Sequence, residues 1–576
     1  MTVTPQAGDA SAGQEPPTTV PGPAGKSGAG PGAGSGAGSA GKPGAGSGAR
    51  IAGAAALIAA LTVLARIAGF GRTVVFISTV KDNALGDLYN AANTVPNIVF
   101  EIVAGGALAS LVVPLLAGAV AGGDKARVEA VTSALLSWTL VLLVPLAVIV
   151  ALLAGPIVVL LGIPADAQDI GARMLRVFAP QLPLYGLGIV LTGVLQAHHR
   201  FAWPVIAPLL SSVTVMGAYL TYALVDGRGT SLGGLTSGGE LALSLGTTLG
   251  VVVLTMSLLI PLRRLHLRLR PTLHFPGESG RQVVRLGWAG AVTVGSQQLM
   301  VLVVIVLAAG SGELTRFNTA QALYLLPWAV LAVPLATAAY PTMAATAERG
   351  DEDGYRATVS RTARPVALFA CLGAAALVAV AVPVANLLGA PKIAPGIVGF
   401  APGLLGYALF ALLSRALYAR GATAAAAAAT AAGWAVAAVA ALLLTAVLPD
   451  RDTVLALALA NSVGMLTLGV LLVSAVRCKA GRGALAGLPR AAGVGIVAAV
   501  AAGAAGWGTA EGLRHALAGT PAGWASLLQG MLGGVVVALV FLAVVYPLDR
   551  HDVRPLITKL VRRGRSRDTV DRKDAT

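Results

Sequence analysis

The sequence predicts an all-helical membrane protein that crosses the bilayer about fourteen times, as the spacing of its apolar segments indicates. Of its 576 residues, 56% are hydrophobic and only 11% are charged, whereas a soluble domain carries roughly 25% charged residues. Apolar segments of roughly 20 residues or more recur, which is the length that an α-helix needs to cross ~30 Å of hydrocarbon. They are too long for membrane-barrel strands and lack their alternation of apolar and polar residues. The fold class is therefore all-α and polytopic.

The chain opens with a segment of different composition. Residues 1–49 consist largely of Gly, Ala, Pro and Ser. Such a segment has too few apolar side chains to form a core, so we expect a disordered cytoplasmic tail.

The predicted spans then follow in order, with boundaries that are uncertain by a few residues. They are 51–80, 85–119, 128–161, 170–197, 202–225, 239–262, 282–309, 315–345, 360–388, 394–419, 422–448, 453–476, 488–509 and 522–547. We divide them into a first group in 51–262, a basic cytoplasmic connector at 263–285, a second group in 286–476, and a last pair in 488–547. The basic connector fits a transporter of two helical lobes. An ordinary cytoplasmic loop is the alternative.

Basic residues in the loops predict the orientation. With the N-terminal tail in the cytoplasm, inside loops hold about three times as many Lys and Arg residues as outside loops, as the positive-inside rule requires. Membrane orientation thus explains the net charge of +16 better than nucleic-acid binding does.

The basic tail 548–576 returns to the cytoplasm. Its apolar residues have helical spacing, which favours an interfacial helix on the inner leaflet over a specific partner site. These residues are Val553, Leu556, Ile557, Leu560 and Val561.

Two arginines interrupt the first predicted span. If Ile51 lies at the inner face, Arg66 is roughly 22 Å along the helix and Arg72 roughly 31 Å. An arginine that faces lipid costs about 2.5–3.5 kcal/mol on the insertion scale. We therefore expect Arg66 to face a water-filled cavity or an acidic partner. Arg72 is near enough to the outer surface for snorkelling to be an equal alternative.

The second predicted span supplies carboxylates. Asp87 lies near its outer end and Glu101 near its middle. One hypothesis is that they form structural ion pairs with Arg66 and Arg72. The other is a polar cavity for a charged head group, with a titratable carboxylate for coupling, because an intramembrane ionisable residue indicates function by default.

Polar residues of other spans complete the candidate substrate-binding set. Asn97 belongs to the second span, Gln297 to the seventh, and Asn318 and Gln321 to the start of the eighth. Single amides in membrane helices more often bond to neighbouring helices than to ligands, so this alternative stays open for each. Arg316 is close enough to the outer face to be an interface residue.

The sequence indicates a transporter rather than an enzyme. It contains no Walker loop, Rossmann fingerprint or metal-spaced cluster of His, Cys, Asp or Glu. We therefore predict no catalytic residue, no metal, no cofactor and no nucleic-acid partner.

Five blocks resemble the MurJ/MviN family, the lipid II flippases of bacterial cell-wall synthesis, in the multidrug/oligosaccharidyl-lipid/polysaccharide exporter superfamily. They are "ARIAGFGR", "NTVPNIVFEIVAGGALASLVVPLLA", "GVLQAHHRFAWPVIAPLL", "LPWAVLAVPLATAAYP" and "LLSRALYARG". The resemblance covers most of residues 51–547. It implies two six-helix lobes with two further C-terminal helices beside the lipid tail, and alternating access around a cationic cavity without ATP. Arg66, Arg72 and Asp87 match the family's head-group residues.

The chain also departs from the family pattern. Phe100 and Glu101 stand where many members carry arginines, and Gln321 and Ala322 replace an acid–arginine pair. The last four spans offer no interior carboxylate for a sodium site. The resemblance therefore leaves the exact lipid and the coupling ion open.

Our leading hypothesis is a lipid II flippase of the bacterial plasma membrane. Its partners would be lipid II or a similar polyprenyl-pyrophosphate glycan, membrane lipids and, as further candidates, cell-wall synthesis proteins. The alternatives are a transporter of another polyprenyl-linked glycan, a drug/cation antiporter of the same fold, and a non-transporting cell-wall scaffold. The antiporter predicts an acidic aromatic cavity. The scaffold predicts that the basic C-terminal tail matters and Arg66 does not.

Overall fold

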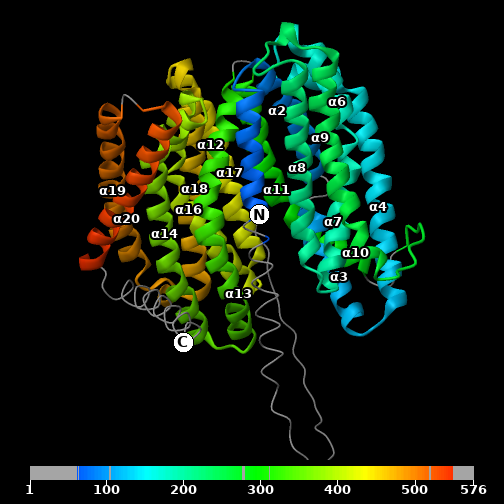
Figure 1. Ribbon diagram of the computed structural model, residues 1–576. Helices are drawn as coiled ribbons and strands as arrows, with labels where there is room; N and C mark the ends of the chain where they lie inside the picture. The colour runs from blue at the N-terminus through cyan, green and yellow to red at the C-terminus, as the bar shows by residue number, and fades with distance from the viewer. Residues whose placement is uncertain are drawn as a thin grey trace, which may run out of the picture. The chain divides into compact units, whose positions relative to one another are not determined.

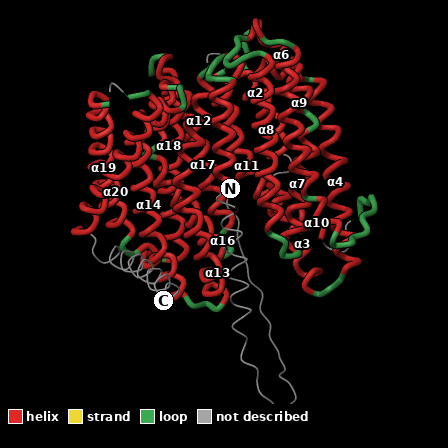
Figure 2. Tube along the Cα trace, in the orientation of Figure 1, coloured by secondary structure: helices red, strands yellow, loops and turns green. Residues whose placement is uncertain are grey.

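The computed structural model describes residues 61, 64–102, 106–274, 279–309, 312–517 and 520–548. Every regular element in these ranges is helical, and none of them contains a strand (Figure 2). All the described residues belong to one compact unit, Ala56–Thr576. The predicted disordered tail 1–49 and the predicted interfacial helix in 548–576 lie outside the described residues, apart from Leu548.

Ten described helices are long and apolar enough to cross a membrane, and a bent pair makes up to eleven. The pair, Pro391–Phe400 with Gly403–Ala419, bends by 52°. The ten agree with predicted spans in order (Figure 1). They are α4 (Lys125–Leu152), Ala165–Ala197, α8 (Ala202–Val225), Ser237–Arg263, Glu313–Glu348, α14 (Glu352–Leu387), α17 (Thr423–Val447), Asp450–Ala480, Arg482–Ala516 and α20 (Ala522–Leu548).

Several of these spans contain more than one element. The parts are α6 (Gln168–Phe178), α7 (Gln181–Ala197), α9 (Ser237–Ser257), α10 (Leu259–Arg263), α12 (Glu313–Pro327), α13 (Val333–Glu348), α15 (Ala394–Phe400), α16 (Gly403–Ala419), α18 (Thr453–Ala480) and α19 (Leu488–Ala516). The predicted span 128–161 is also divided, into α4 and the short α5 (Ala154–Leu160).

Of the three remaining predicted spans, 51–80 and 85–119 include residues outside the described ranges. Residues 64–79 of the first are helical. Within 85–119 the described residues include α2 (Ala84–Phe100) and α3 (Gly106–Ala121), and 282–309 corresponds to α11 (Ser279–Ala308). The full count of about fourteen therefore remains a prediction from segment length.

The connector between the two groups is shorter than predicted. Helix α10 ends at Arg263 and α11 already begins at Ser279, where we expected a loop over 263–285. The basic residues Arg281 and Arg285, which the predicted connector includes, belong to α11. A membrane helix can continue beyond the apolar layer, so basic residues do not mark where it ends.

A wide helical turn interrupts the span Glu313–Glu348. The π turn η4 (Trp328–Ala332) follows Pro327, whose ring and missing N–H disturb the preceding turn. The indole nitrogen of Trp328 donates to the carbonyl oxygen of Tyr407 in α16 at 3.1 Å. Such turns are frequent at functional sites, and this one follows directly on α12, which lines the site described below.

Candidate functional site

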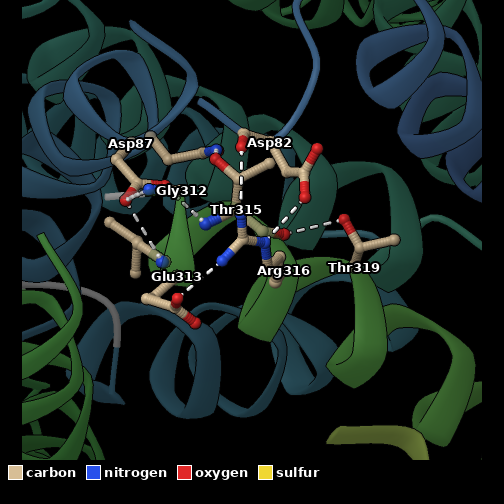
Figure 3. Close-up of polar contacts among 9 residues, drawn as sticks. Asp82, Asp87, Gly312, Glu313, Thr315, Arg316 and Thr319 are labelled. Carbon is tan, nitrogen blue, oxygen red and sulfur yellow. Dashed lines mark hydrogen bonds and ion pairs between the residues drawn. The ribbon is translucent and has the colours of Figure 1, made fainter. Parts of the chain in front are cut away.

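A carboxylate of α2 caps the first turn of α12 (Figure 3). Oδ2 of Asp87 accepts hydrogen bonds from the backbone N–H of Gly312 at 2.7 Å and of Leu314 at 3.4 Å, and Oδ1 accepts from Thr315 at 2.8 Å. The first N–H groups of a helix lack partners within it, and Gly312 has no side chain to cap them. Asp87 supplies the missing cap from another helix, where its charge also suits the helix dipole.

An ion-pair network joins the same two segments. Nε of Arg316 donates to Oδ2 of Asp82 at 2.6 Å, and Nη1 donates to Oε1 of Glu313 at 2.5 Å. Arg316 is only 8% exposed, because its guanidinium lies between these two carboxylates; its place at the membrane interface stays a prediction. The two carboxylates make burial of this charge favourable, and removal of either would leave it undercompensated. We call Asp82, Asp87, Gly312, Glu313 and Arg316 the α2–α12 clasp.

The clasp requires a glycine at its centre. Gly312 has a φ of +90°, and a Cβ built there would lie 2.3 Å from the carbonyl oxygen of Asp82. Left-handed backbone costs a non-glycine residue about 1–2 kcal/mol, and the steric conflict adds to it. The backbone of α12 can approach Asp82 only because this residue has no side chain.

Gly312→Ala is therefore expected to destabilise the clasp by roughly 2–4 kcal/mol and to lower the Tm of the purified protein. Gly350→Ala is the matched control, because Gly350 has a φ of +68° but open space around its Cβ position. It should lower the Tm less, through backbone strain alone. Thermal unfolding in detergent measures both changes. Equal losses of stability would show that the approach to Asp82 contributes nothing.

A polar cavity of about 290 Å³ begins beside the clasp. Thr315 links the two: its N–H donates to Asp87 of the clasp, and its hydroxyl, at the cavity wall, accepts from Nδ2 of Asn90 at 3.0 Å. We call this space the Arg72 cavity, because Arg72 is the one charged residue among the described residues that line it. Its other lining residues include Tyr89, Asn90, Asn93, Tyr219, Thr247, Thr315, Asn318, Thr319 and Gln321.

The guanidinium of Arg72 is available to an anion. Arg72 is exposed, and no ion pair within the described ranges includes it. Tyr89 and Tyr219 line the same cavity. The Tyr89 hydroxyl already bonds with those of Tyr219 at 2.9 Å and Thr247 at 2.7 Å. Because these neutral groups satisfy one another, the donors of Arg72 remain free for a charged oxygen.

A second cavity, of about 100 Å³, shares a wall with the first. Asn318 and Gln321 of α12 line both spaces, and Gln297 of α11 and Asn461 of α18 complete the amide lining of the second. We call it the Gln297 cavity. Oδ1 of Asn461 is buried without a hydrogen-bond partner, which is costly for an amide. A polar group in this cavity would relieve that cost.

A third cavity, of about 450 Å³, holds the other two polar candidates of α2. Asn97 and Glu101 line it, together with Tyr185 and Gln196 of α7. We call it the Glu101 cavity. Glu101 is partly exposed there.

The structure thus distributes the predicted site residues over neighbouring spaces. Arg72, Asn318 and Gln321 line the Arg72 cavity, while Gln297 lines the Gln297 cavity. Arg66 is exposed and lines none of these three cavities. Its charge acts on Tyr407 of α16.

Asp87 lies in the clasp, 1% exposed. Within the described ranges, no ion pair joins Asp87 or Glu101 to Arg66 or Arg72. The hypothesis of structural ion pairs therefore finds no support there. The candidate role of Asp87 toward substrate would have to act through the clasp.

Sequence reasoning missed Asp82, Gly312, Glu313 and Asn461. A signal existed for three of them. In "GELTR" at the start of α12, Gly312 directly precedes Glu313, and Glu313 is three residues before Arg316. In α18, Asn461 interrupts the apolar run "LALALANSVGML". No signal in the sequence connects Asp82 with Arg316.

Comparisons with known proteins agree with this architecture. The family model described as lipid II flippase MurJ matches residues 78–514. A lipid II flippase MurJ of Burkholderia cenocepacia is 26% identical over 390 residues, which are 63% of this chain and 72% of the relative. A probable lipid II flippase MurJ of Rhizobium meliloti is 26% identical over 347 residues, 58% of this chain and 62% of the relative.

Solved structures share the fold. A lipid II flippase MurJ in an inward closed conformation aligns with a TM-score of 0.64 at 16% identity, over 85% of this chain and 99% of that one. An inward-facing multidrug resistance transporter of the MATE family aligns with a TM-score of 0.58 at 15% identity, over 73% and 94%. The family model covers most of the chain, and the described helices include ten candidate membrane spans. This multi-pass membrane protein therefore belongs to the lipid II flippase MurJ family.

Proposed function

We propose that this protein moves lipid II, or a closely similar polyprenyl-pyrophosphate glycan, from the inner to the outer leaflet of the bacterial plasma membrane. The observation that carries the proposal is the guanidinium of Arg72, which forms no ion pair with any described residue and lines a polar cavity beside the clasp. A guanidinium is well matched to a pyrophosphate in charge and in hydrogen-bond geometry. The neighbouring amides Asn318, Gln321 and Gln297 suit the sugar and peptide groups of such a head group.

The proposed topology has about fourteen helices in two six-helix lobes plus the last pair, α19 and α20, beside the lipid tail. Both termini lie in the cytoplasm, as the distribution of basic loop residues predicts. In this orientation the clasp belongs to the outer end, since it joins the start of α2 to the start of α12. The clasp is then an outer gate in its closed state.

Transport proceeds by alternating access. The head group enters while the clasp is closed, and its charge is balanced by Arg72. The clasp then opens: its ion pairs and the hydrogen bonds of Asp87 break, and water binds the separated groups. The bound lipid shifts the equilibrium between the closed and open states only by the difference between its affinities for them. Glu101 is the candidate carboxylate for coupling, because no ion pair within the described ranges holds it.

A depletion–rescue experiment tests the proposal. Cells depleted of their own lipid II flippase would express this chain, and an extracellular probe would report surface lipid II. Wild type is expected to restore it. Failure of a well-expressed, membrane-inserted wild type would contradict the assignment of lipid II as the substrate.

The same assay measures the contribution of Arg66. Arg66→Ala is expected to lower surface lipid II by about fivefold or less, since an exposed charge outside the cavities contributes about 1 kcal/mol or less. Membrane expression measured by blot is the control for insertion. Wild-type activity of this variant would remove Arg66 from the site.

A further inference from the structure

The loop after α10 lies as an extended strap along α4. The backbone N–H of Arg268 donates to Oε1 of Glu129 at 2.9 Å, that of Arg270 to Oγ of Ser133 at 3.1 Å, and that of Thr272 to Oγ of Ser137 at 3.0 Å. We call residues 265–274 the α4 strap. It lies within the predicted basic connector.

The register of the strap follows from the two backbone repeats. Two extended residues advance roughly 6.6 Å, and four helical residues advance roughly 6 Å. Every second N–H of the strap therefore meets every fourth side chain of α4. Pro271, which has no N–H, falls at a position that needs no donor. Nε1 of Trp138 donates to the carbonyl oxygen of Leu273 at 2.9 Å and fixes the far end.

This register determines where the side chains of the strap lie. Leu265 and Leu267 pack against the buried cluster between α3, α4, α7 and α10. Arg268 and Arg270 are exposed, and no ion pair in the described part of the chain includes either. Residues two apart in an extended chain point to the same side. The two guanidinium groups can therefore act on one ligand.

The level of the strap on α4 matches the head-group layer. Trp138 is 47% exposed, and the exposed apolar residues Leu140, Val141 and Leu142 follow it. Tryptophan is enriched where hydrocarbon meets head groups. Ser133, which holds the N–H of Arg270, lies roughly 7.5 Å from Trp138 toward the polar end of α4. The head-group layer on each side of a bilayer is of similar thickness, roughly 5–8 Å.

We propose that the α4 strap binds the phosphate of an anionic glycerophospholipid. Arg268 and Arg270 hold the phosphate, and the acyl chains lie against Trp138, Leu273 and the exposed face of α4. The charges are complementary, and the apolar surface for the chains adjoins the two arginines. A bound lipid would anchor the first group of helices to the inner leaflet. This inference requires membrane insertion but not the substrate proposed above.

Quenching of Trp138 by brominated lipids tests the site. The full chain would be reconstituted in phosphatidylcholine with a small fraction of brominated phosphatidylglycerol or brominated phosphatidylcholine. Trp138→Phe subtracts the signal of the other tryptophans. Brominated phosphatidylglycerol is expected to quench Trp138 more strongly than brominated phosphatidylcholine does. The same quenching by both lipids would overturn the proposal.

Two double variants distinguish specific lipid binding at the strap from non-specific attraction by the positive charge of the protein. Removal of both strap arginines in Arg268→Gln/Arg270→Gln is expected to weaken the phosphatidylglycerol preference by roughly 30-fold. Arg477→Gln/Lys479→Gln removes two exposed charges at the end of α18 and should leave the preference intact. If this control loses the preference equally, the effect is general electrostatics and the strap binds no lipid specifically.

A third variant tests the positioning. Ser133→Ala/Ser137→Ala removes two acceptors of the strap without changing the net charge. It should reduce the preference partly, because the arginines remain but are less well placed. An unchanged preference would show that attachment to α4 plays no part in lipid binding.

Discussion

Arg72→Ala is expected to lower lipid II transport by roughly 10- to 100-fold. Arg72 is the one charged residue among the described residues that line its cavity. A charge-assisted hydrogen bond contributes about 1.5–3 kcal/mol, and each 1.4 kcal/mol corresponds to a factor of ten. No neighbouring cation lining this cavity can take over, because the remaining lining groups are neutral. Surface lipid II in depleted cells measures the change.

Arg72→Lys should retain part of the activity, because an ammonium keeps the charge but loses the two-pronged geometry of the guanidinium. Arg451→Ala removes the same charge from a side chain that is 84% exposed and should behave as wild type. If Arg72→Ala transports normally at wild-type expression, the head group is not bound by Arg72.

Asp87→Ala is expected to shift the clasp strongly toward its open state. The carboxylate accepts two short hydrogen bonds, at 2.7 and 2.8 Å, from the first turn of α12. Without it these N–H groups are buried with no acceptor, or the end of α12 separates from α2 and water binds them. A loss of about 3 kcal/mol would change the ratio of closed to open molecules by roughly 100-fold.

Cysteine accessibility from the outside measures this shift. Thr73→Cys places a thiol at the Arg72 cavity, and Cys478→Ser removes the exposed native cysteine, while Cys371 is buried. In this background, Asp87→Ala should raise the labelling rate with a membrane-impermeant maleimide by roughly tenfold or more. Asp87→Asn should give an intermediate rate, since one oxygen can still accept.

Asp353→Ala is the control for this measurement. Its carboxylate is 98% exposed and forms only a surface ion pair with Arg356 at 3.6 Å, which contributes little. The labelling rate should not change in this variant. Unchanged labelling in Asp87→Ala would show that the Asp87 cap does not hold the outer end closed.

The clasp and the Arg72 cavity are mechanically connected through one turn of helix. Thr315 donates its N–H to Asp87 and accepts from Asn90 at the cavity wall. Arg316, the next residue, carries the ion pairs to Asp82 and Glu313. A load that moves α12 at the cavity must therefore strain the clasp. This arrangement offers a physical route from binding to opening.

The sequence by itself determined the helical membrane fold and the polar residues to examine. Segment length and composition suffice for this, because an exposed backbone in hydrocarbon must satisfy its own hydrogen bonds within a helix. Arg72 could be identified as unusual from its place in an apolar run alone. The boundaries were less accurate where a predicted span is divided, as at α4 and α5, and where α11 begins.

Only the tertiary structure decided which residues act together. Asp87 and the N–H of Gly312 are 225 residues apart, and Arg268 and Glu129 are 139 apart. Periodicity describes one helix at a time and says nothing of the helix that packs against it. The sequence therefore predicted a head-group role for Asp87, although its carboxylate accepts hydrogen bonds from the first turn of α12. The sequence likewise indicated no partner for Arg316, because Asp82 precedes a different helix, α2, and only packing brings the two charges together.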